Sequence, residues 1–515
     1  MTETEKSPLK QVAGFDDNSV EPGVWRYERA SRARLVVDGE NYFDLIQQAM
    51  LKANQRILMI GWDFDTRIHL SKGRRWFERP YSKEYPSRLG SFILWLNRHR
   101  PGLEIRILKW SYGFIKFFGR GSMLMDIARW WPKKRIDFKF DTAHPIGCSH
   151  HQKIVVIDDR FAVCGGIDMT SHRWDTRDHL EHDTQRKRPG EQPYGPWHDV
   201  TMFMEGEVAA ALDQLGRTRW IRAGGKPLEP PKACPDSAWP EGLEPNFENV
   251  EIGIARTRAQ YDCDPKIDEI EQLFRQQIAS AKHFIYAENQ YFASRAICEA
   301  IAARLAEPDP PEIVIVHPAN ADGWAEQLAM DPARAELVRA IRELDHDECF
   351  HLYVPYTGKT PIYVHAKLMI VDDRIIRVGS ANFNNRSMGL DSECDVFIDC
   401  SRPGNGHCGE TIRALRMAQL AEHCGVSPQE VEVLLERNGS MAGMIAELGD
   451  RHARHLRPFH PPEPSDIEVG LAERQVFDPE TPEGLFEVRE PGSGLFRRGS
   501  LLARAKNRLD RRKRR

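Results

Sequence analysis

The spacing of apolar residues predicts a helix followed by a strand at two places in the chain. Phe43, Ile46, Met50 and Ala53 recur every three or four residues, as on one face of a helix, and the run RILMIGWDFD follows from Arg56. A similar apolar series occupies positions 267, 270, 274 and 278, and HFIYAENQYF follows it from position 283. We therefore expect two related structural units, because similarity at a distance within one chain indicates an internal repeat.

The elements that follow these strands repeat as well. Each copy has a short apolar strand, at 103–108 (LEIRIL) and 312–318 (EIVIVHP). Each then has a hairpin pattern, at 150–168 (HHQKIVVIDDRFAVCGGID) and 364–382 (VHAKLMIVDDRIIRVGSAN). Strands that alternate with helices predict an α/β fold. We expect two similar α/β-sandwich halves that form a pseudo-dimer, with one shared active site on the pseudo-twofold axis.

Changes in composition suggest where the units begin and end. The first half is predicted over 25–223 and the second over 250–404, with a linker rich in Pro and Gly at 224–249. A helical extension is expected over 405–457. Within it, Ser427-Pro428-Gln429-Glu430 predicts a helix start and Asn438-Gly439 a helix end. Residues 458–515 are predicted to be an extended or disordered tail with a basic C-terminus.

Composition indicates the cellular compartment in which the protein is expected. The ten cysteines include no C-x-x-C pair, and several lie in apolar runs, which favours reduced thiols in a reducing compartment. No stretch approaches 18 apolar residues, and the polar N-terminus does not resemble a signal peptide. We expect a cytoplasmic protein that would meet any lipid from the water side, peripherally at the membrane.

The two hairpins carry the candidate chemistry. His151 and Lys153 share one face of a strand, because residues two apart point to the same side, and His365 and Lys367 repeat this geometry. Two ammonium groups suit the anionic oxygens of a phosphodiester. One imidazole can attack phosphorus as a nucleophile, giving a phosphohistidine intermediate, while the other transfers protons to and from the leaving and entering oxygens.

An aspartate ends each of these two patterns. Asp158 and Asp372 lie seven residues after their histidines, so a regular strand would point them away from the imidazoles. We expect both to have a structural role in the turn, although they are members of the same catalytic motif.

The pattern H-x-K-x-x-x-x-D, present at 151–158 and 365–372, resembles the phospholipase D superfamily and most of all phospholipase D proper. The resemblance covers roughly 25–425 and extends to GGIDMTSHRWDT (165–176), PWHDVTMFMEG (196–206), ENQYF (288–292) and GSANFNNRSMGLDSE (379–393). It implies a catalytic set of two motifs, which comprises His151, Lys153, Asp158, His365, Lys367 and Asp372.

The resemblance also implies individual roles. His151 would be the nucleophile and His365 the acid and base, while Lys153, Lys367 and Asn382 would hold the phosphate. Asp168 stands in the first half where Asn382 stands in the second, and an acid there would repel phosphate and bind a neighbouring group instead. Asp199 would orient His151, and Glu393 would orient His365, each acid acting on the histidine of its own half.

Several features have a second interpretation. His150-His151 could suggest a metal site, but no further ligands follow at zinc spacing, so no metal and no cofactor are expected. The aromatic and basic residues of 110–137 suit either a membrane interface or packing on the sheet. From position 497 to the C-terminus there are ten Lys and Arg against one Asp, which suits either an anionic membrane surface or a solvated tail.

The leading hypothesis is hydrolysis of a phosphatidyl ester to phosphatidic acid and a headgroup, with alcohols competing against water as acceptor. A phosphatidyltransferase of the cardiolipin synthase kind is the alternative, although that group usually carries N-terminal membrane helices. A nuclease is disfavoured by the acidic bulk of the chain, because binding nucleic acid depends on neutralising phosphates. A tyrosyl-DNA phosphodiesterase is disfavoured because both motif aspartates are present. An inactive lipid-binding scaffold is disfavoured because no motif His or Lys is lost.

Overall fold

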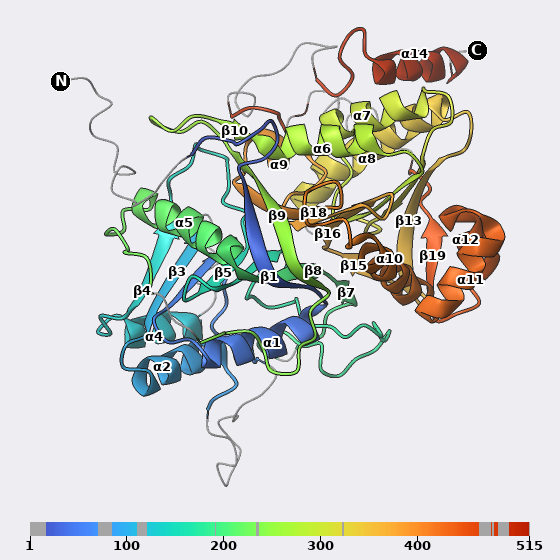
Figure 1. Ribbon diagram of the computed structural model, residues 1–515. Helices are drawn as coiled ribbons and strands as arrows, with labels where there is room; N and C mark the ends of the chain where they lie inside the picture. Colours follow the sequence, from blue (N-terminus) through green and yellow to red (C-terminus); the bar gives the residue numbers. More distant parts are fainter. Residues whose placement is uncertain are drawn as a thin grey trace.

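A computed structural model describes residues 17–70, 85–110, 121–190, 192–232, 236–321, 324–462, 475, 478–482 and 494–513. Its mixed α/β architecture confirms the fold class expected from the sequence (Figure 1). The first half comprises β1(Arg26–Val37), α1(Gly39–Leu51), β2(Arg56–Gly61), α2(Leu89–His99), β3(Glu104–Trp110), α4(Gly121–Trp130), β4(Ile136–Asp141), β5(Ile154–Ile157), β6(Phe161–Gly165), β7(Trp197–His198), β8(Val200–Gly206) and α5(Glu207–Arg222).

The second half repeats this order of elements. It comprises β9(Phe247–Arg258), β10(Ile267–Asp268), α6(Glu269–Ser280), β11(Phe284–Asn289), α7(Arg295–Leu305), β12(Glu312–Val316), α8(Trp324–Leu344), β13(Phe350–Thr357), β14(Thr360–Pro361), β15(Tyr363–Val364), β16(Lys367–Val371), β17(Ile375–Gly379), α9(Asn385–Gly389) and β18(Glu393–Asp399). The elements that follow are α10(Gly409–Cys424), α11(Pro428–Asn438), α12(Met441–Leu448), β19(Arg454–Pro458) and α14(Leu501–Lys513).

The strands of both halves are joined by hydrogen bonds in one continuous order. That order is β4-β3-β2-β5-β6-β8-β1-β9-β18-β17-β16-β11-β12-β13. It reads the same outward from its centre, where β1 and β9 pair antiparallel and lie side by side (Figure 1). In each half three parallel strands are followed by the antiparallel motif hairpin. This symmetry is the pseudo-dimer that the sequence repeat predicted.

Helices cover both faces of each half. In the first half α1 and α2 bury an apolar face, and in the second half α6, α7 and α8 do so, each set with its own cluster of buried side chains. A third cluster includes apolar residues of α5, β1, β9, α10 and α12, so it spans both halves. The two halves therefore share one apolar core on this face.

Local sequence signals explain where α11 begins and ends. The Ser427 hydroxyl accepts a hydrogen bond from the Glu430 backbone N–H, and Pro428 occupies the first turn. Gly439 ends the helix with φ 69°, a left-handed conformation that glycine adopts without strain. Both helix signals are confirmed.

Two segments differ from the sequence prediction. The segment predicted as a linker is packed, since Trp239 within it is buried and its carbonyl accepts a hydrogen bond from Lys52. The prediction of an extended or disordered tail was wrong for 501–513. These residues form α14, which buries Leu502 and packs against α7 and α8. The apolar face of α14 is inconspicuous in the sequence, because most of its other positions are charged or polar.

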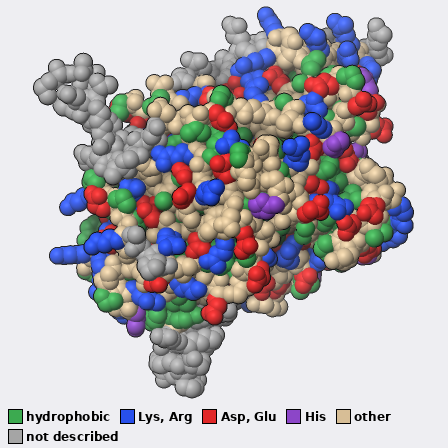
Figure 2. All heavy atoms as spheres, viewed as in Figure 1, with side chains coloured by type: hydrophobic (Ala, Val, Ile, Leu, Met, Phe, Trp, Pro, Cys, Tyr) green, Lys and Arg blue, Asp and Glu red, His purple; other side chains and the backbone are tan. Residues whose placement is uncertain are grey.

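Helix α14 keeps a basic outer face. Arg504, Arg508 and Arg511 are exposed at successive helical turns, and basic side chains gather over α14 at the upper edge of Figure 2. Lys506 pairs with Glu336, and Arg512 pairs with Glu343, so acidic residues of α8 hold the helix. The tail predicted to reach an anionic membrane is thus a docked helix. Of the aromatic and basic stretch at 110–137, positions 111–120 lie outside the described residues.

No helix in the described parts of the chain is long and apolar enough to cross a membrane.

The motif aspartates lie in the turns of the two hairpins. Asp158 and Asp372 have φ of 53° each, as the left-handed hairpin turn requires. The Asp158 carboxylate accepts hydrogen bonds from the backbone N–H groups of Asn54, Gln55 and Arg56, at 2.7 to 2.8 Å. Asp372 accepts the equivalent three bonds from residues 282–284. The sequence parity argument therefore holds: both carboxylates fasten the hairpin to the start of the neighbouring strand.

We predict that Asp158→Ala lowers the free energy of unfolding by about 2–4 kcal/mol, because three backbone donors lose a charged acceptor. Urea denaturation measures the change. Asp309→Ala is the matched control, since Asp309 has the same φ of 53° but an exposed side chain. Equal destabilisation by the two substitutions would contradict the fastening role.

Candidate functional site

Backbone pairing across the seam between the halves positions both motif histidines. The short strands β7 and β15 pair in parallel, and the His365 N–H donates to the His198 carbonyl at 2.8 Å. At the symmetric position His150 bridges to Ser392, and the His151 N–H donates to the Ser392 carbonyl at 2.9 Å. Each histidine is thus held by the half to which it does not belong.

The carboxylates that contact the imidazoles also come from the opposite half. Both Glu393 oxygens lie 3.0 Å from His151 Nδ1, and Asp199 Oδ2 lies 2.7 Å from His365 Nδ1. The expectation that each acid orients the histidine of its own half was therefore wrong. Spacing along the chain could not reveal this exchange, because only the pseudo-twofold arrangement places each acid opposite the other motif.

The two carboxylates are held by different devices. Glu393 accepts hydrogen bonds from the hydroxyl groups of Ser380 and Ser387, the latter at 2.6 Å. Asp199 accepts the Val200 N–H at 2.9 Å and lies against Gly166, where a Cβ atom would be only 2.0 Å from Asp199 Oδ1. A side chain at position 166 would thus displace the shorter acid. Sequence reasoning missed both serines, although they lie in the GSANFNNRS segment.

The two lysines have unequal surroundings. Lys153 Nζ lies 3.5 Å from Asp168 Oδ2, while Lys367 Nζ donates to the neutral amide oxygen of Gln290 at 3.0 Å. Asp168 also accepts the Trp62 N–H at 3.1 Å, so it binds neighbouring groups as the sequence suggested. The positive charge of Lys153 is partly balanced, and that of Lys367 is less so.

Asn382 occupies the place of Asp168 in the second half. Its backbone N–H donates to the Ser387 hydroxyl at 3.0 Å. Its buried side-chain oxygen has no hydrogen-bond partner among the described residues. In the described residues the Asn382 side-chain oxygen accepts no hydrogen bond, whereas one oxygen of Asp168 accepts the Trp62 N–H.

The motif lysines of both halves influence the pKa values of both motif histidines. Burial lowers the pKa of both His151 and His365 well below the usual value, and the ammonium groups of Lys153 and Lys367 depress both further. Burial also lowers the pKa of Lys367 to about 7 and raises that of Asp199 to about 6. These surroundings favour neutral imidazoles, and a bound anion would oppose that preference.

Aromatic rings flank each histidine. The Trp62 ring lies edge-on to His151 with centroids 6.2 Å apart and stacks on Trp110. The ring centroids of Trp197 and His365 are 5.1 Å apart. The Arg173 guanidinium lies over the Trp197 ring, 4.3 Å from its centroid. Arg173 also depresses the pKa of His365. Sequence reasoning assigned no role to Trp62, Trp197 and Arg173, and it treated Trp110 only as part of the aromatic stretch at 110–137.

A buried cluster of acids and histidines adjoins the site. Asp38, His179, His198 and Glu422 place one ligand atom each within 4.8 Å of one another, and His198 forms a second such group with Glu288 and His423. These side chains could hold a divalent cation. Alternatively, protonated imidazoles balance the acids, since the carboxylates raise the pKa of His179 to about 9. No spacing pattern indicates this cluster in the sequence, because its donors come from distant segments of the chain.

Comparison with known proteins agrees with this geometry. A family model described as "Cardiolipin synthase, PLD-like domain" matches residues 274–405. Phospholipase D A of Dictyostelium discoideum is 26% identical over 77% of this chain, and phospholipase D1 of Schizosaccharomyces pombe is 25% identical over 58% of it. These matches support the resemblance of this chain to the phospholipase D superfamily. The resemblance to this superfamily that the sequence suggested is thereby supported.

The superfamily relatives differ from this chain in size. The match covers 36% of the Dictyostelium protein and 28% of the Schizosaccharomyces protein, so the chain spans about a third of their length. The solved structure of a phosphatidylserine synthase from Haemophilus influenzae matches 82% of this chain and 97% of its own, with 12% identity and a TM-score of 0.48.

We predict that the two acids of this site, Glu393 and Asp199, act on the histidines of the opposite half. Glu393→Gln should shift the imidazole nitrogen resonances of His151 more than those of His365, and Asp199→Asn should do the reverse. Selective ¹⁵N-histidine NMR measures both, with His151→Gln and His365→Gln to assign the signals. Larger shifts at the histidine of the same half would contradict the exchanged contacts.

Proposed function

We propose that the protein is a phospholipase D-type phosphodiesterase, which cleaves a phosphatidyl ester to phosphatidic acid and a free headgroup. The observation that carries this proposal is the convergence of two imidazole–carboxylate pairs and two lysines at one seam. The names of the relatives, phospholipase D A and phospholipase D1, support the same activity.

His151 is proposed as the nucleophile. When its Nδ1–H donates to Glu393, the lone pair of Nε2 is free to attack phosphorus. A bond forms between Nε2 and phosphorus, and the bond from phosphorus to the headgroup oxygen breaks. Lys153, Lys367 and Asn382 would hold the phosphate oxygens while negative charge builds on them.

His365 is proposed as the proton carrier. Its Nδ1 faces Asp199, so Nε2 would give its proton to the leaving oxygen. The same nitrogen would then take a proton from water, whose oxygen attacks phosphorus and releases His151. The phosphate would help His365 to be protonated, because a bound anion opposes the depression of its pKa by the two lysines.

The acceptor could also be an alcohol, in which case the product is a new phosphatidyl ester. A family model described as "Cardiolipin synthase, PLD-like domain" matches residues 274–405. This match favours a phosphatidyltransferase as the second candidate. Both reactions share the covalent intermediate and differ only in the group that attacks it.

Incubation with mixed phospholipids and ethanol, followed by mass spectrometry, tests the proposal. A phospholipase D should release phosphatidic acid and phosphatidylethanol from a phosphatidyl ester. A dedicated transferase should yield an ester of its own acceptor alcohol with little phosphatidic acid. Absence of all three kinds of product would contradict both candidates.

We predict that neither histidine is dispensable. His151→Ala and His365→Ala should each lower kcat by about 10³-fold or more, because one removes the nucleophile and the other the proton carrier. The double substitution should be little worse than either single one. His283→Ala, at an exposed histidine of the second half, is the control. Near-full activity of either single variant, in a headgroup-release assay, would refute the shared site.

We predict that kcat/KM falls as pH rises above about 7. The pKa of Lys367 is about 7, so its ammonium form, which would bind phosphate, is present below this pH and lost above it. Lys367→Arg should move the alkaline limb of the profile upward, because arginine stays charged, even if the absolute rate is lower. Profiles that coincide between pH 7 and 9, once normalised, would argue against this role.

A further inference from the structure

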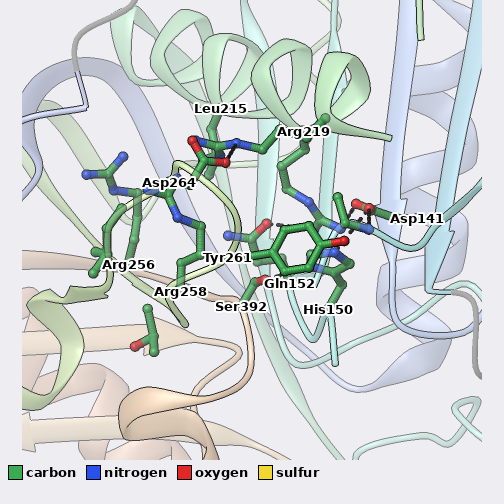
Figure 3. Close-up of a pocket in the computed structure, with 14 residues that line it drawn as sticks. Asp141, His150, Gln152, Leu215, Arg219, Arg256, Arg258, Tyr261, Asp264 and Ser392 are labelled. Carbon is green, nitrogen blue, oxygen red and sulfur yellow. Dashed lines mark hydrogen bonds and ion pairs between the residues drawn. The ribbon is translucent and has the colours of Figure 1, made fainter. Parts of the chain in front are cut away.

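The hollow between α5 and β9 is internally balanced in charge (Figure 3). Each guanidinium group in its lining pairs with a carboxylate: Arg219 with Asp141, Arg222 with Asp264, Arg256 with Glu269, and Arg258 with Asp17. In the buried cluster of acids and histidines that adjoins the candidate active site, by contrast, the carboxylates outnumber the guanidinium groups that pair with them.

We call this second group of residues the acid–histidine cluster. It consists of four side chains whose ligand atoms lie within 4.8 Å of one another: Asp38, His179, His198 and Glu422. Two further carboxylates contact its rings from outside, Asp175 at His179 and Glu288 at His198. In the part of the chain that the structure describes, the guanidinium groups that pair with these four carboxylates are those of Arg177 and Arg186. Two negative charges thus remain to be balanced by imidazolium protons or by one divalent cation.

The ring nitrogens of the cluster face more acceptors than neutral imidazoles can serve. His179 Nδ1 lies 3.0 Å from Asp175 Oδ2, and its Nε2 lies 3.1 Å from Glu422 Oε1. His198 Nε2 lies 2.8 Å from Glu288 Oε2, and its Nδ1 lies 2.9 Å from Glu422 Oε1. A neutral imidazole donates from one nitrogen only, and an ionised carboxylate only accepts. The inner nitrogen of each ring therefore needs either an extra proton or a cation.

Extra protons would satisfy this geometry incompletely. His198 Nδ1 lies 2.9 Å from Glu422 and 3.1 Å from Asp38, yet it is aligned for a hydrogen bond with neither. Asp38 Oδ2 lies 3.5 Å from His179 Nε2, and among the described residues it too has no hydrogen-bond partner. Buried polar atoms without partners cost free energy, whereas a cation between them would bond to all four side chains.

The backbone at Asp38 supports a ligand role for this residue. Asp38 occupies the N-cap position of α1 with φ 65°, a conformation that costs energy for a residue other than glycine. An N-cap aspartate usually accepts a hydrogen bond from the first turn of its helix, but the Asp38 side chain makes no such bond. Its carboxylate turns to the acid–histidine cluster instead.

The spacing of the donor atoms suits a four-coordinate ion. Neighbouring donors lie 2.9 to 3.5 Å apart. The ligands of a tetrahedral zinc ion, each about 2.0–2.2 Å from the metal, lie about 3.2–3.6 Å from one another. Asp175 and Glu288 hold the outer ring nitrogens, as carboxylates do behind metal-bound histidines. We propose that the acid–histidine cluster is a closed, structural binding site for a divalent transition-metal ion, for which zinc is the best match.

An ion at this position would join α10 to the first half beside the candidate active site. Glu422 lies in α10, which follows the second half, and the other three ligands belong to the first half. His198 precedes Asp199, the acid that contacts His365, and the Asp199 N–H donates to Asp38 Oδ1 at 3.1 Å. All four ligands are buried, so the ion would have no position open to substrate and would act by fixing Asp199 in place.

Metal analysis of the full-length protein tests this proposal. The protein is stripped with dipicolinate, mixed with zinc and dialysed against imidazole, which removes ions held by single surface histidines. About one zinc ion per chain should be retained. Zinc should also raise the Tm of the stripped protein by several degrees, because a closed site binds metal in the folded state, and magnesium, which prefers oxygen ligands, should not. A stripped protein that neither retains zinc nor gains stability from it would overturn the proposal.

Two substitutions locate the ion. Glu422→Gln and Asp38→Asn should each weaken zinc binding about tenfold or more, since loss of an outer partner alone has an effect of this size. His317→Gln is the matched control, because His317 is a fully buried histidine of the second half that contacts Arg334 and not the cluster. Equal zinc affinities of Glu422→Gln and His317→Gln would refute the assignment.

Cobalt(II) bound to the unaltered protein keeps the test decisive if these variants fold poorly. Four nitrogen and oxygen ligands should give the strong visible absorption of tetrahedral cobalt, which zinc should abolish by displacement. The ten cysteines of the chain are the competing ligands, and they would add a near-ultraviolet charge-transfer band. Such a thiolate band, or the weak spectrum of six-coordinate cobalt, would exclude the proposed ligand set.

Discussion

The exchange of carboxylates between the halves is the constraint on which the rest of the structure depends. His151 needs Glu393, and His365 needs Asp199, so neither half contains a complete imidazole–acid pair of its own. The antiparallel pairing of β1 and β9 fixes the halves in the register that this exchange requires. The two bridges at His150–Ser392 and Val364–His198 hold the histidines within reach. A buried imidazole that lost its acceptor would cost free energy, so substitutions of Glu393 or Asp199 should not be tolerated well.

The two halves have diverged around this common plan. The first half uses Asp199, which reaches its position only because Gly166 has no side chain. The second half uses the longer Glu393, with Ser380 and Ser387 to hold it. Similarly, Lys153 has an acidic neighbour in Asp168, whereas Lys367 faces the neutral Gln290. These differences make the two sides of the site chemically unequal, which is consistent with the two unlike roles that we propose for the histidines.

Much of the fold was accessible from the sequence, because it is written in local patterns. Alternating strands, the repeated hairpins and the capping residues of α11 each depend on neighbours in the chain. The turn role of Asp158 followed from strand parity alone.

The contacts between each acid and the histidine of the opposite half could not be predicted, since spacing within a half is the same whichever histidine an acid contacts. The buried cluster around His179 and His198 was missed because its members converge from separate segments. The docking of α14 was missed because a few apolar positions, such as Leu502, are hidden among many charges.

The contacts between the histidines and their acids join residues 242 and 166 positions apart in the chain. Contacts of such high contact order form late in folding, after local hairpins and helices have appeared. An intermediate with one folded half would have a nearly native core in that half. Its histidine would still lack the carboxylate that the other half supplies. Recovery of activity after refolding would thus lag behind recovery of secondary structure, and turnover would report on the docking of the halves.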